Sequence, residues 1–297
     1  MALIVLVGCA ALGLRVLPPQ MNAAALAAPK AELLAAITSY NEATAIDGVP
    51  SVDFGVSGGE LDQDSRAPRD LLTAGAFYGV SQRVGEAADR VVSAIEAITP
   101  FNPTPNPTKG LGEARGFSRE DCPLAGQWYN KWTTAADATF SADSKRGAAT
   151  VSNIVNGASG RTTNVIEFSP PDKPWLRATR KAVPPPPLES LKVVLSARAA
   201  SPTRVELIFR RVRARLNLAL FGGRLKFGLT LILPVPGPFL TRLLFLFRPS
   251  KRPPLAYFDV LYLDDDLRVH RTAQGNLFVQ SRPPAPEVGE VEGVLEG

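Results

Sequence analysis

Residues able to do acid–base, nucleophilic or metal chemistry are scarce in this chain of 297 residues, which contains one histidine and two cysteines. This count excludes a three-histidine or four-cysteine zinc site and most haem and iron–sulfur ligation. His270 is close to Arg268 and Arg271, whose charges would lower its affinity for a proton, and no serine or cysteine forms a recognisable nucleophile motif beside it. We therefore expect His270 to be structural or solvent-facing. We also expect the chain to have no catalytic residue, metal site or cofactor.

Three consecutive aspartates, residues 264 to 266, precede these arginines. A calcium loop would need further oxygen ligands at fixed spacing and a closing glutamate, so the better interpretation is a turn stabilised by aspartate hydrogen bonds. Asp264 or Asp266 is close enough in sequence to pair with Arg268, and Arg271 follows. We expect these four residues to form a structural polar network that closes one end of the fold or touches a polar lipid headgroup.

Aromatic residues could line an apolar interior. Trp128 and Trp132 are four residues apart and would lie on one face of a regular strand. If that face points inward, these two side chains could line a ligand cavity together with Tyr262 and Phe278. The alternative is that they belong to an ordinary core.

Positive charge is concentrated in the most apolar part of the chain. Residues 173–252 contain 17 lysines and arginines and 2 acidic residues, whereas the net charge of the whole chain is +5. Single-strand nucleic-acid binders interleave stacking aromatic residues with their arginines, and this segment does not. Basic residues mixed with leucine and phenylalanine instead favour an anionic membrane surface, unless they form the outer face of an ordinary sheet.

The apolar segment from residue 216 to 247 carries the predicted lipid contact. Pro234, Pro236 and Pro238 argue against a membrane-spanning helix, because closely spaced prolines leave backbone groups unsatisfied in lipid. We expect strands here, with these residues at a lipid surface: Phe239, Leu240, Leu243, Leu244, Phe245, Phe247, Arg248, Lys251 and Arg252. The alternative is that the same segment is a buried strand.

The elements that must position these residues change in character along the chain. Apolar residues at three- and four-residue spacing predict helices over residues 30–46, beginning just after Pro29, and 82–98. After residue 121, short alternating or β-branched runs predict an antiparallel barrel or sandwich. The expected strands are 126–133, 150–155, 162–168, 191–198, 204–212, 224–233, 257–263, 267–271 and 276–280.

Both ends of the chain differ from the part between them. Residues 1–29 contain an apolar run and almost no charge, which is typical of a targeting segment. Residues 283–297 form an acidic tail rich in proline and glycine, which we expect to be disordered. We assign residues 30–282 to one domain, with a helical part at 30–110 that contains an insertion, and a β-barrel at 121–282.

Several motifs carry a family resemblance over residues 30–282. The most specific is the series from Tyr262-Leu263-Asp264 through Asp266-Leu267-Arg268 and Arg271 to Gly275-Asn276-Leu277-Phe278-Val279; a Gly126-Gln127-Trp128 strand start is moderately specific. This series resembles the plastid lipid-associated protein family, also called plastid fibrillins or plastoglobulins. Thr272 and Ala273 depart from the family pattern, which usually has glycine directly after the second arginine.

The resemblance implies a lipocalin-like antiparallel barrel with two N-terminal helices that pack on it or plug it. It also implies residence in a plastid, on thylakoids or lipid globules, and the binding or sequestering of lipids or isoprenoids without catalysis. The signal-like N-terminus suggests a plastid reached through the secretory pathway. The alternative function is a structural subunit whose apolar, basic surface packs on a membrane-associated protein complex. A third is an enzyme acting on an isoprenoid or a fatty acid.

Overall fold

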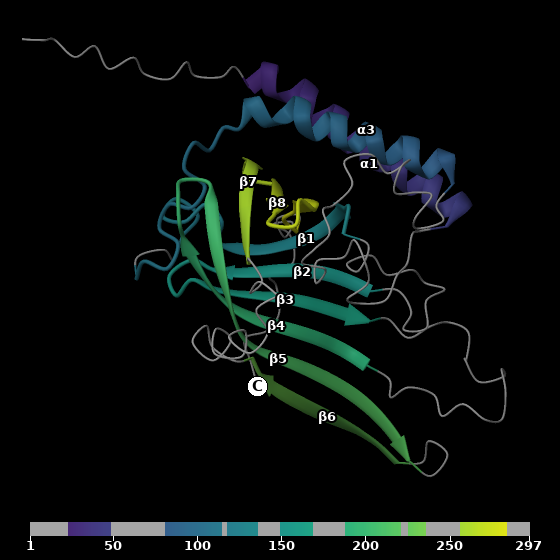
Figure 1. The fold of residues 1–297 in the computed structure, drawn as a ribbon, viewed down its shortest axis with the longest axis vertical. Helices are drawn as coiled ribbons and strands as arrows, with labels where there is room; N and C mark the ends of the chain where they lie inside the picture. The colour runs from purple at the N-terminus through teal and green to yellow at the C-terminus, as the bar shows by residue number, and fades with distance from the viewer. Residues whose placement is uncertain are drawn as a thin grey trace, which may run out of the picture.

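The computed structural model describes residues 23–48, 81–114, 118–135, 149–168, 188–220, 225–235 and 256–283. In these residues the chain forms two α-helices, a short 3₁₀ turn and nine β-strands that belong to one antiparallel sheet (Figure 1). The expectation of a mainly β protein with two N-terminal helices is therefore confirmed. The predicted targeting segment up to residue 22 and the predicted tail from residue 284 lie outside the described residues.

The two helices are α1, Ala23–Asp47, and α3, Gln82–Ile98. Helix α3 begins where predicted because the side-chain oxygen of Ser81 accepts a hydrogen bond from the backbone N–H of Val84 at 3.2 Å, which caps the first turn. Helix α1 begins before its predicted start, so that Pro29 lies inside it. Alanine has the highest helix propensity, and the alanine-rich residues 23–28 extend the helix to the N-terminal side of the proline.

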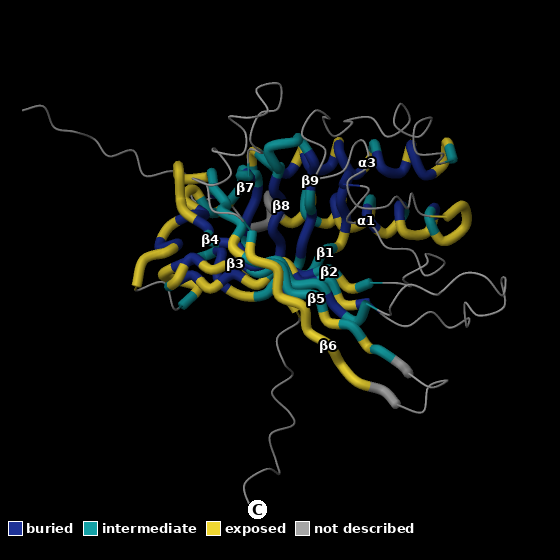
Figure 2. The backbone as a smooth tube through the Cα atoms, turned by 60° about the horizontal axis from the view of Figure 1, so that its bottom comes forward, coloured by how far each residue is buried: buried dark blue, intermediate teal, exposed yellow. Residues whose placement is uncertain are grey.

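Both helices share a hydrophobic core with the C-terminal strands. Buried residues of α1 and α3 form one cluster with Trp132, Tyr262, Val269 and Val279. The ring of Tyr40 meets that of Trp132 edge-on, with 6.0 Å between centroids. Burial raises the pKa of Tyr40 to about 12. The helices lie side by side along this part of the sheet (Figures 1 and 2).

The strands pair in a ring. Their bounds are β1 Gly126–Thr133, β2 Ala149–Asn156, β3 Arg161–Phe168, β4 Leu188–Ala199, β5 Arg204–Leu220, β6 Leu225–Pro234, β7 Tyr257–Leu263, β8 Leu267–Thr272 and β9 Leu277–Ser281. The order of pairing is β4-β3-β2-β1-β9-β8-β7-β5-β6, and β5 also pairs with β4. Eight strands thus follow one another back to the start, while β6 pairs with the second half of β5 and lies outside the ring.

The two faces of the sheet have separate cores. The inner face of the ring carries a buried cluster from five strands that includes Trp128, Val155, Val205 and Phe258. Leu124, from the segment that precedes β1, belongs to the same cluster. The outer face carries the core shared with the helices. A side chain's face is therefore fixed by its position in the strand register.

Strand β5 differs most from its expected bounds. It runs to Leu220 rather than to residue 212, because the alternation of arginine with apolar residues continues past the predicted end. A register shift between Val194 and Leu195 of β4 places Arg211 and Arg213 on the outer face of the sheet. The added length pairs with β6 as a long hairpin.

Candidate functional site

A buried arginine lies on the inner face of the ring. Arg268 of β8 is 1% exposed. Its Nε and Nη2 both donate to Oε1 of Gln280 on β9, the former at 2.9 Å, and Nη2 also donates to Oδ1 of Asn153 on β2 at 2.7 Å. The Nη1 group of Arg268 has no hydrogen-bond partner. Both side chains that accept from Arg268 are neutral amides, so its charge is not balanced by either of them.

Arg268 and a second arginine, Arg282, both lie close to the ring of Trp128. The guanidinium carbons of Arg268 and Arg282 lie 5.0 and 3.9 Å from the ring centroid of Trp128. Arg282 also donates to the carbonyl oxygens of Ala125, at 2.6 Å, and Pro123, at 2.7 Å. These bonds hold the segment before β1 against the ring of strands. Burial and repulsion from Arg282 lower the pKa of Arg268. These contacts therefore gather positive charge at one end of the inner face.

His270 is buried on the same face, between two phenylalanine rings. Its ring lies 4.8 Å from that of Phe258 and is stacked on that of Phe278 at 5.0 Å. Burial and the charge of Arg268 lower the pKa of His270 well below 6.5, so the imidazole is neutral at pH 7. Its Nδ1 has no hydrogen-bond partner. Of the two expected placements for His270, the structural one holds.

The four residues expected to line a cavity are divided between the two faces. Trp128 and Phe278 are on the inner face, whereas Trp132 and Tyr262 belong to the outer core with the helices. For the tryptophans, the reason is a register shift between Asn130 and Trp132 in the pairing of β1 with β9, which adds one residue and reverses the alternation. A second shift, between Val260 and Tyr262 in the pairing of β7 with β8, turns Tyr262 to the outer face. The expectation that both tryptophans share a face is therefore wrong.

The expected polar network is also divided. Asp264 accepts hydrogen bonds from Nζ of Lys30 on α1, at 2.6 Å, and from the hydroxyl of Tyr262, at 2.6 Å. Asp266 lies 3.6 Å from the same Lys30 nitrogen. Arg268 contacts neither aspartate, because it points to the inner face. Arg271 lies opposite Asp259 on the outer face, where the carboxylate of Asp259 is bound by Arg204.

Aspartate hydrogen bonds do stabilise the turn between β7 and β8, as predicted. Oδ1 of Asp264 accepts from the backbone N–H of Asp266 at 2.8 Å and of Leu267 at 2.7 Å. Burial alone would raise the pKa of Asp264, but these bonds and those from Lys30 and Tyr262 outweigh it and lower the pKa. Within the described residues, no group of three or more histidine, cysteine, aspartate or glutamate side chains could hold a metal ion.

The hairpin of β5 and β6 is amphipathic. Apolar side chains of β6 are aligned on the face that continues the inner face of the ring, and they are exposed: Phe227, Leu229, Leu231 and Leu233. The opposite face carries Arg211, Arg213 and Arg215 of β5. Figure 2 shows this exposed hairpin extending away from the rest of the molecule. The sequence indicated a strand here, but its exposed apolar face follows from the projection of the hairpin beyond the ring.

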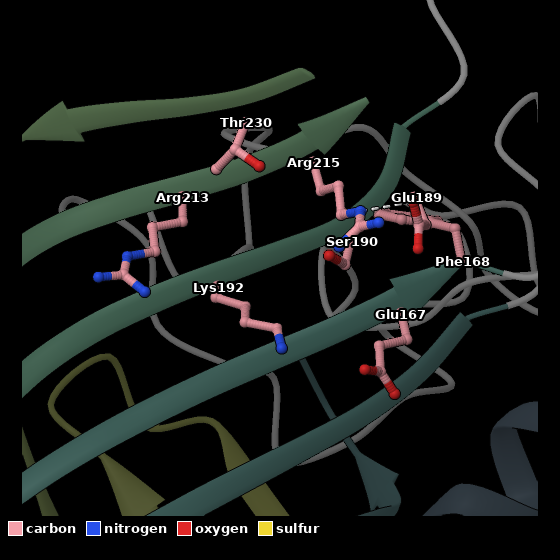
Figure 3. Close-up of a pocket in the computed structure, with 8 residues that line it drawn as sticks. All are labelled: Glu167, Phe168, Glu189, Ser190, Lys192, Arg213, Arg215 and Thr230. Carbon is pink, nitrogen blue, oxygen red and sulfur yellow. Dashed lines mark ion pairs between the residues drawn. The ribbon is translucent and has the colours of Figure 1, made fainter. Parts of the chain in front are cut away.

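A charged cleft lies beside the arginines of this hairpin. It has a volume of about 520 Å³ and is lined by side chains of β3, β4, β5 and β6 (Figure 3). Within it, Nε of Arg215 lies 2.9 Å from a carboxylate oxygen of Glu189. Lys192 and Arg213 face the same space. The two glutamates that line the cleft, Glu167 and Glu189, give it mixed charge, which is typical of a solvated outer surface.

The nine residues expected at a lipid surface, from Phe239 to Arg252, lie outside the described residues. In the part of the chain that the structure describes, no helix is long and apolar enough to span a membrane. Asn153, Gln280 and Arg282 were not predicted from the sequence. A usable signal for the last two was their alternation with Val279 and Ser281 at the end of β9, which places polar side chains on one face.

One comparison with known proteins identifies a family. The sequence model of the PAP_fibrillin family matches residues 70–281, which is more than two thirds of the chain. This match confirms the resemblance to plastid fibrillins found in the sequence. No curated protein and no solved structure matched the chain.

Proposed function

The chain belongs to the PAP_fibrillin family, and from this we propose that it is a plastid lipid-associated protein that docks reversibly on a lipid surface through its β5–β6 hairpin. The surface is a thylakoid membrane or a plastoglobule, and residues 1–29 direct the chain to the plastid, by way of the secretory pathway. The protein binds or sequesters lipids or isoprenoids and is not an enzyme. Its ring of strands acts as a lipocalin-like barrel that receives an apolar ligand.

The observation that carries this proposal is the row of exposed apolar side chains on β6. Phe227, Leu229 and Leu231 are each about 40% exposed and Leu233 is 61% exposed, all on one face of the hairpin. Soluble proteins rarely leave a contiguous apolar surface uncovered unless it contacts a partner or a membrane. In the sequence, the hairpin is followed by residues 239–252, for which lipid contact is predicted.

The charges of the hairpin favour an anionic lipid surface as the occupant. Arg211, Arg213 and Arg215 alternate with the apolar residues of β5, so they lie on the face opposite the exposed apolar row and give the hairpin a positive charge along its length. Burying about 200 to 300 Å² of leucine and phenylalanine surface contributes about 5 to 8 kcal/mol before the cost of binding is subtracted. Arginines near an anionic surface add an attraction that salt screens.

Co-sedimentation of the full chain with vesicles tests this proposal. We expect the protein to pellet with vesicles that contain an anionic lipid, to pellet less with neutral vesicles, and to pellet less at high salt. The substitution Leu231→Gln should reduce the bound fraction several-fold. Ile232→Gln is the matched control, because Ile232 is equally apolar, is 55% exposed and lies on the opposite face of the same strand. Equal loss from both variants, or no binding by the unmodified chain, would contradict the proposal.

The second candidate is a structural subunit of a membrane-associated protein complex. It is favoured by β6 standing at the end of the strand order, so that among the described residues no strand pairs with its outer edge. An exposed edge is a template for a strand from another chain. The same experiment separates the two functions, because docking on a protein partner does not occur on protein-free vesicles.

A further inference from the structure

We propose that the inner face of the ring binds the carboxylate of a long-chain fatty acid, with Arg268 as the group that holds the charge. This inference rests on the proposed lipid-binding function and names the class of lipid. It starts from the uncompensated charge of Arg268. Among the described residues, the hydrogen-bond acceptors of this guanidinium are Gln280 and Asn153, and neither carries a negative charge.

A buried cation without an anion is costly. Moving a charged side chain out of water without a counter-charge costs several kcal/mol even after the protein relaxes, so buried charges are normally paired. Arg268 is 1% exposed, and the charge that lowers its pKa, together with burial, is the like charge of Arg282. A bound water could satisfy Nη1 but would not balance the charge. A bound anion would do both.

Further unpartnered polar atoms lie on the same face. Nη1 of Arg268, Nδ1 of His270 and Oδ1 of Asn130 are all buried without a hydrogen-bond partner. Gln280 pairs in register with both Arg268 and Asn130, and His270 is two residues from Arg268 on β8, so the three side chains share the inner face. The Arg268 and His270 nitrogens can donate, and the amide of Asn130 can rotate to donate as well. Three donors on one face suit a carboxylate.

The surroundings of this cluster suit an apolar chain. Phe258 and Phe278 flank His270, and farther round the inner face the register aligns the half-buried side chains of Val151, Ile166, Leu191 and Val193. A polar path also joins the cluster to solvent. Asn153, which accepts from Arg268, donates to Oδ1 of Asn164 at 2.5 Å, and Asn164 is exposed. The ligand class is therefore an amphiphile with an anionic head and an apolar tail.

The test compares oleate with methyl oleate and with acetate, using calorimetry on the full chain without vesicles. We expect oleate to bind at least about tenfold more tightly than its methyl ester, because the ester lacks the charge that strengthens hydrogen bonds from Arg268. Acetate should bind far more weakly than oleate, since it has no tail. Equal binding of acid and ester would overturn the inference, and acetate binding as tightly as oleate would reduce the site to a plain anion site.

Two variants assign the effect to Arg268. Arg268→Met should abolish the preference for oleate over the ester, whereas Arg271→Met should preserve it, because Arg271 lies on the outer face of the same strand. If Arg268→Met does not fold, the comparison of acid with ester on the unmodified chain still decides. With oleate labelled at its carboxyl carbon, NMR should show the bound carboxylate staying ionised to lower pH than free oleate.

The outcome is separable from that of the proposed function. Vesicle docking that persists without oleate binding would refute the fatty-acid site and leave the docking proposal standing. Oleate binding without vesicle docking would refute docking through the hairpin and leave the site on the inner face.

Discussion

At the scale of single residues, His270 makes the stability of the fold depend on pH. It is the only histidine in the chain, it is buried, and its pKa is lowered well below 6.5 by burial and by Arg268. Below about pH 6.5, His270 therefore binds a proton in the unfolded chain but stays neutral in the folded chain. The contribution of this histidine to stability is complete above that pH and is lost as the pH falls below it.

The substitution His270→Phe should flatten this dependence. Two phenylalanine rings already flank the site, so a third aromatic ring fits its surroundings. Between pH 6.5 and pH 5, the free energy of unfolding of the unmodified chain should fall more steeply than that of the variant, by up to about 1.4 kcal/mol per pH unit. Urea denaturation at a series of pH values measures the difference. Two parallel stability curves would show that His270 is not held neutral in the folded chain.

The face of the sheet on which each side chain lies was the feature least predictable from the sequence. The strand that contains Trp128 and Trp132 was predicted with its correct bounds, yet the two side chains lie on opposite faces. The extra residue in β1 near Lys131 carries no sequence signal of its own, since a bulge arises from how two strands meet. The partners of Arg268 were equally hidden, because the aspartates close to it in sequence are more obvious acceptors than Gln280 and Asn153, which lie on other strands.

At the scale of elements, Asp264 fastens helix α1 to the turn between β7 and β8. Its carboxylate accepts from Lys30 of the helix, from Tyr262 of β7 and from two backbone N–H groups of the turn. The contact spans most of the domain in sequence. The helix was predicted from periodicity alone, and its partner could not be, because the ion pair depends on how the helix lies on the sheet.

Replacing Asp264 by alanine should destabilise the domain by about 2 to 4 kcal/mol, since a part-buried carboxylate and its donors all lose their partners. Asp264→Asn should cost less, because an amide oxygen can still accept from the turn. Because the pKa of Asp264 is lowered in the folded chain, its contribution is present above the unfolded pKa and is lost as the pH falls through the folded value. Thermal or urea unfolding at neutral and acidic pH checks both points. The exposed neighbour Asp265 provides the control, and an equal cost for Asp265→Ala would contradict this role of Asp264.

The strands themselves were predicted more accurately than the pairing between them. Short alternating runs bounded by turn residues predicted every described strand, and β1 and β7 have the predicted bounds. Strand β5 was underestimated because alternating arginine and apolar residues suggest a polar surface as readily as a long hairpin. Its length depends on pairing with β6, which is a tertiary property.

At the scale of the whole molecule, β5 joins the ring to the hairpin. Its first residues pair with β7 and complete the ring, and its later residues pair with β6. The pairing with β7 is short, covering residues 204 to 206 opposite 257 to 259. The backbone N–H groups of Leu207 and Val260 extend it, donating to Ala256 at 2.7 Å and Thr203 at 2.9 Å. This pairing of β5 with β7, which we call the seam, is the shortest stretch of pairing in the ring. We therefore expect it to open first.

Arg204 reinforces the seam from the outer face. Its guanidinium donates to both carboxylate oxygens of Asp259, at 2.7 and 2.8 Å, and lies 4.2 Å from the ring centroid of Tyr257. Both of these partners belong to β7, opposite the start of β5. The side chain is half-exposed, so solvent screens the ion pair and its effect on global stability is small.

The substitution Arg204→Ala should therefore loosen the seam without unfolding the ring. The expected result is amide hydrogen exchange at Leu207 and Val260 that is a few-fold faster, with exchange in β2 and β3 unchanged, since opening is local. Arg198→Ala is the matched control, because Arg198 forms an exposed ion pair with Glu206 at 2.6 Å on the pairing between β4 and β5 rather than across the seam. Faster exchange in every strand would mean that the ring opens as one unit. Unchanged exchange at both amides would mean that Arg204 does not hold it closed.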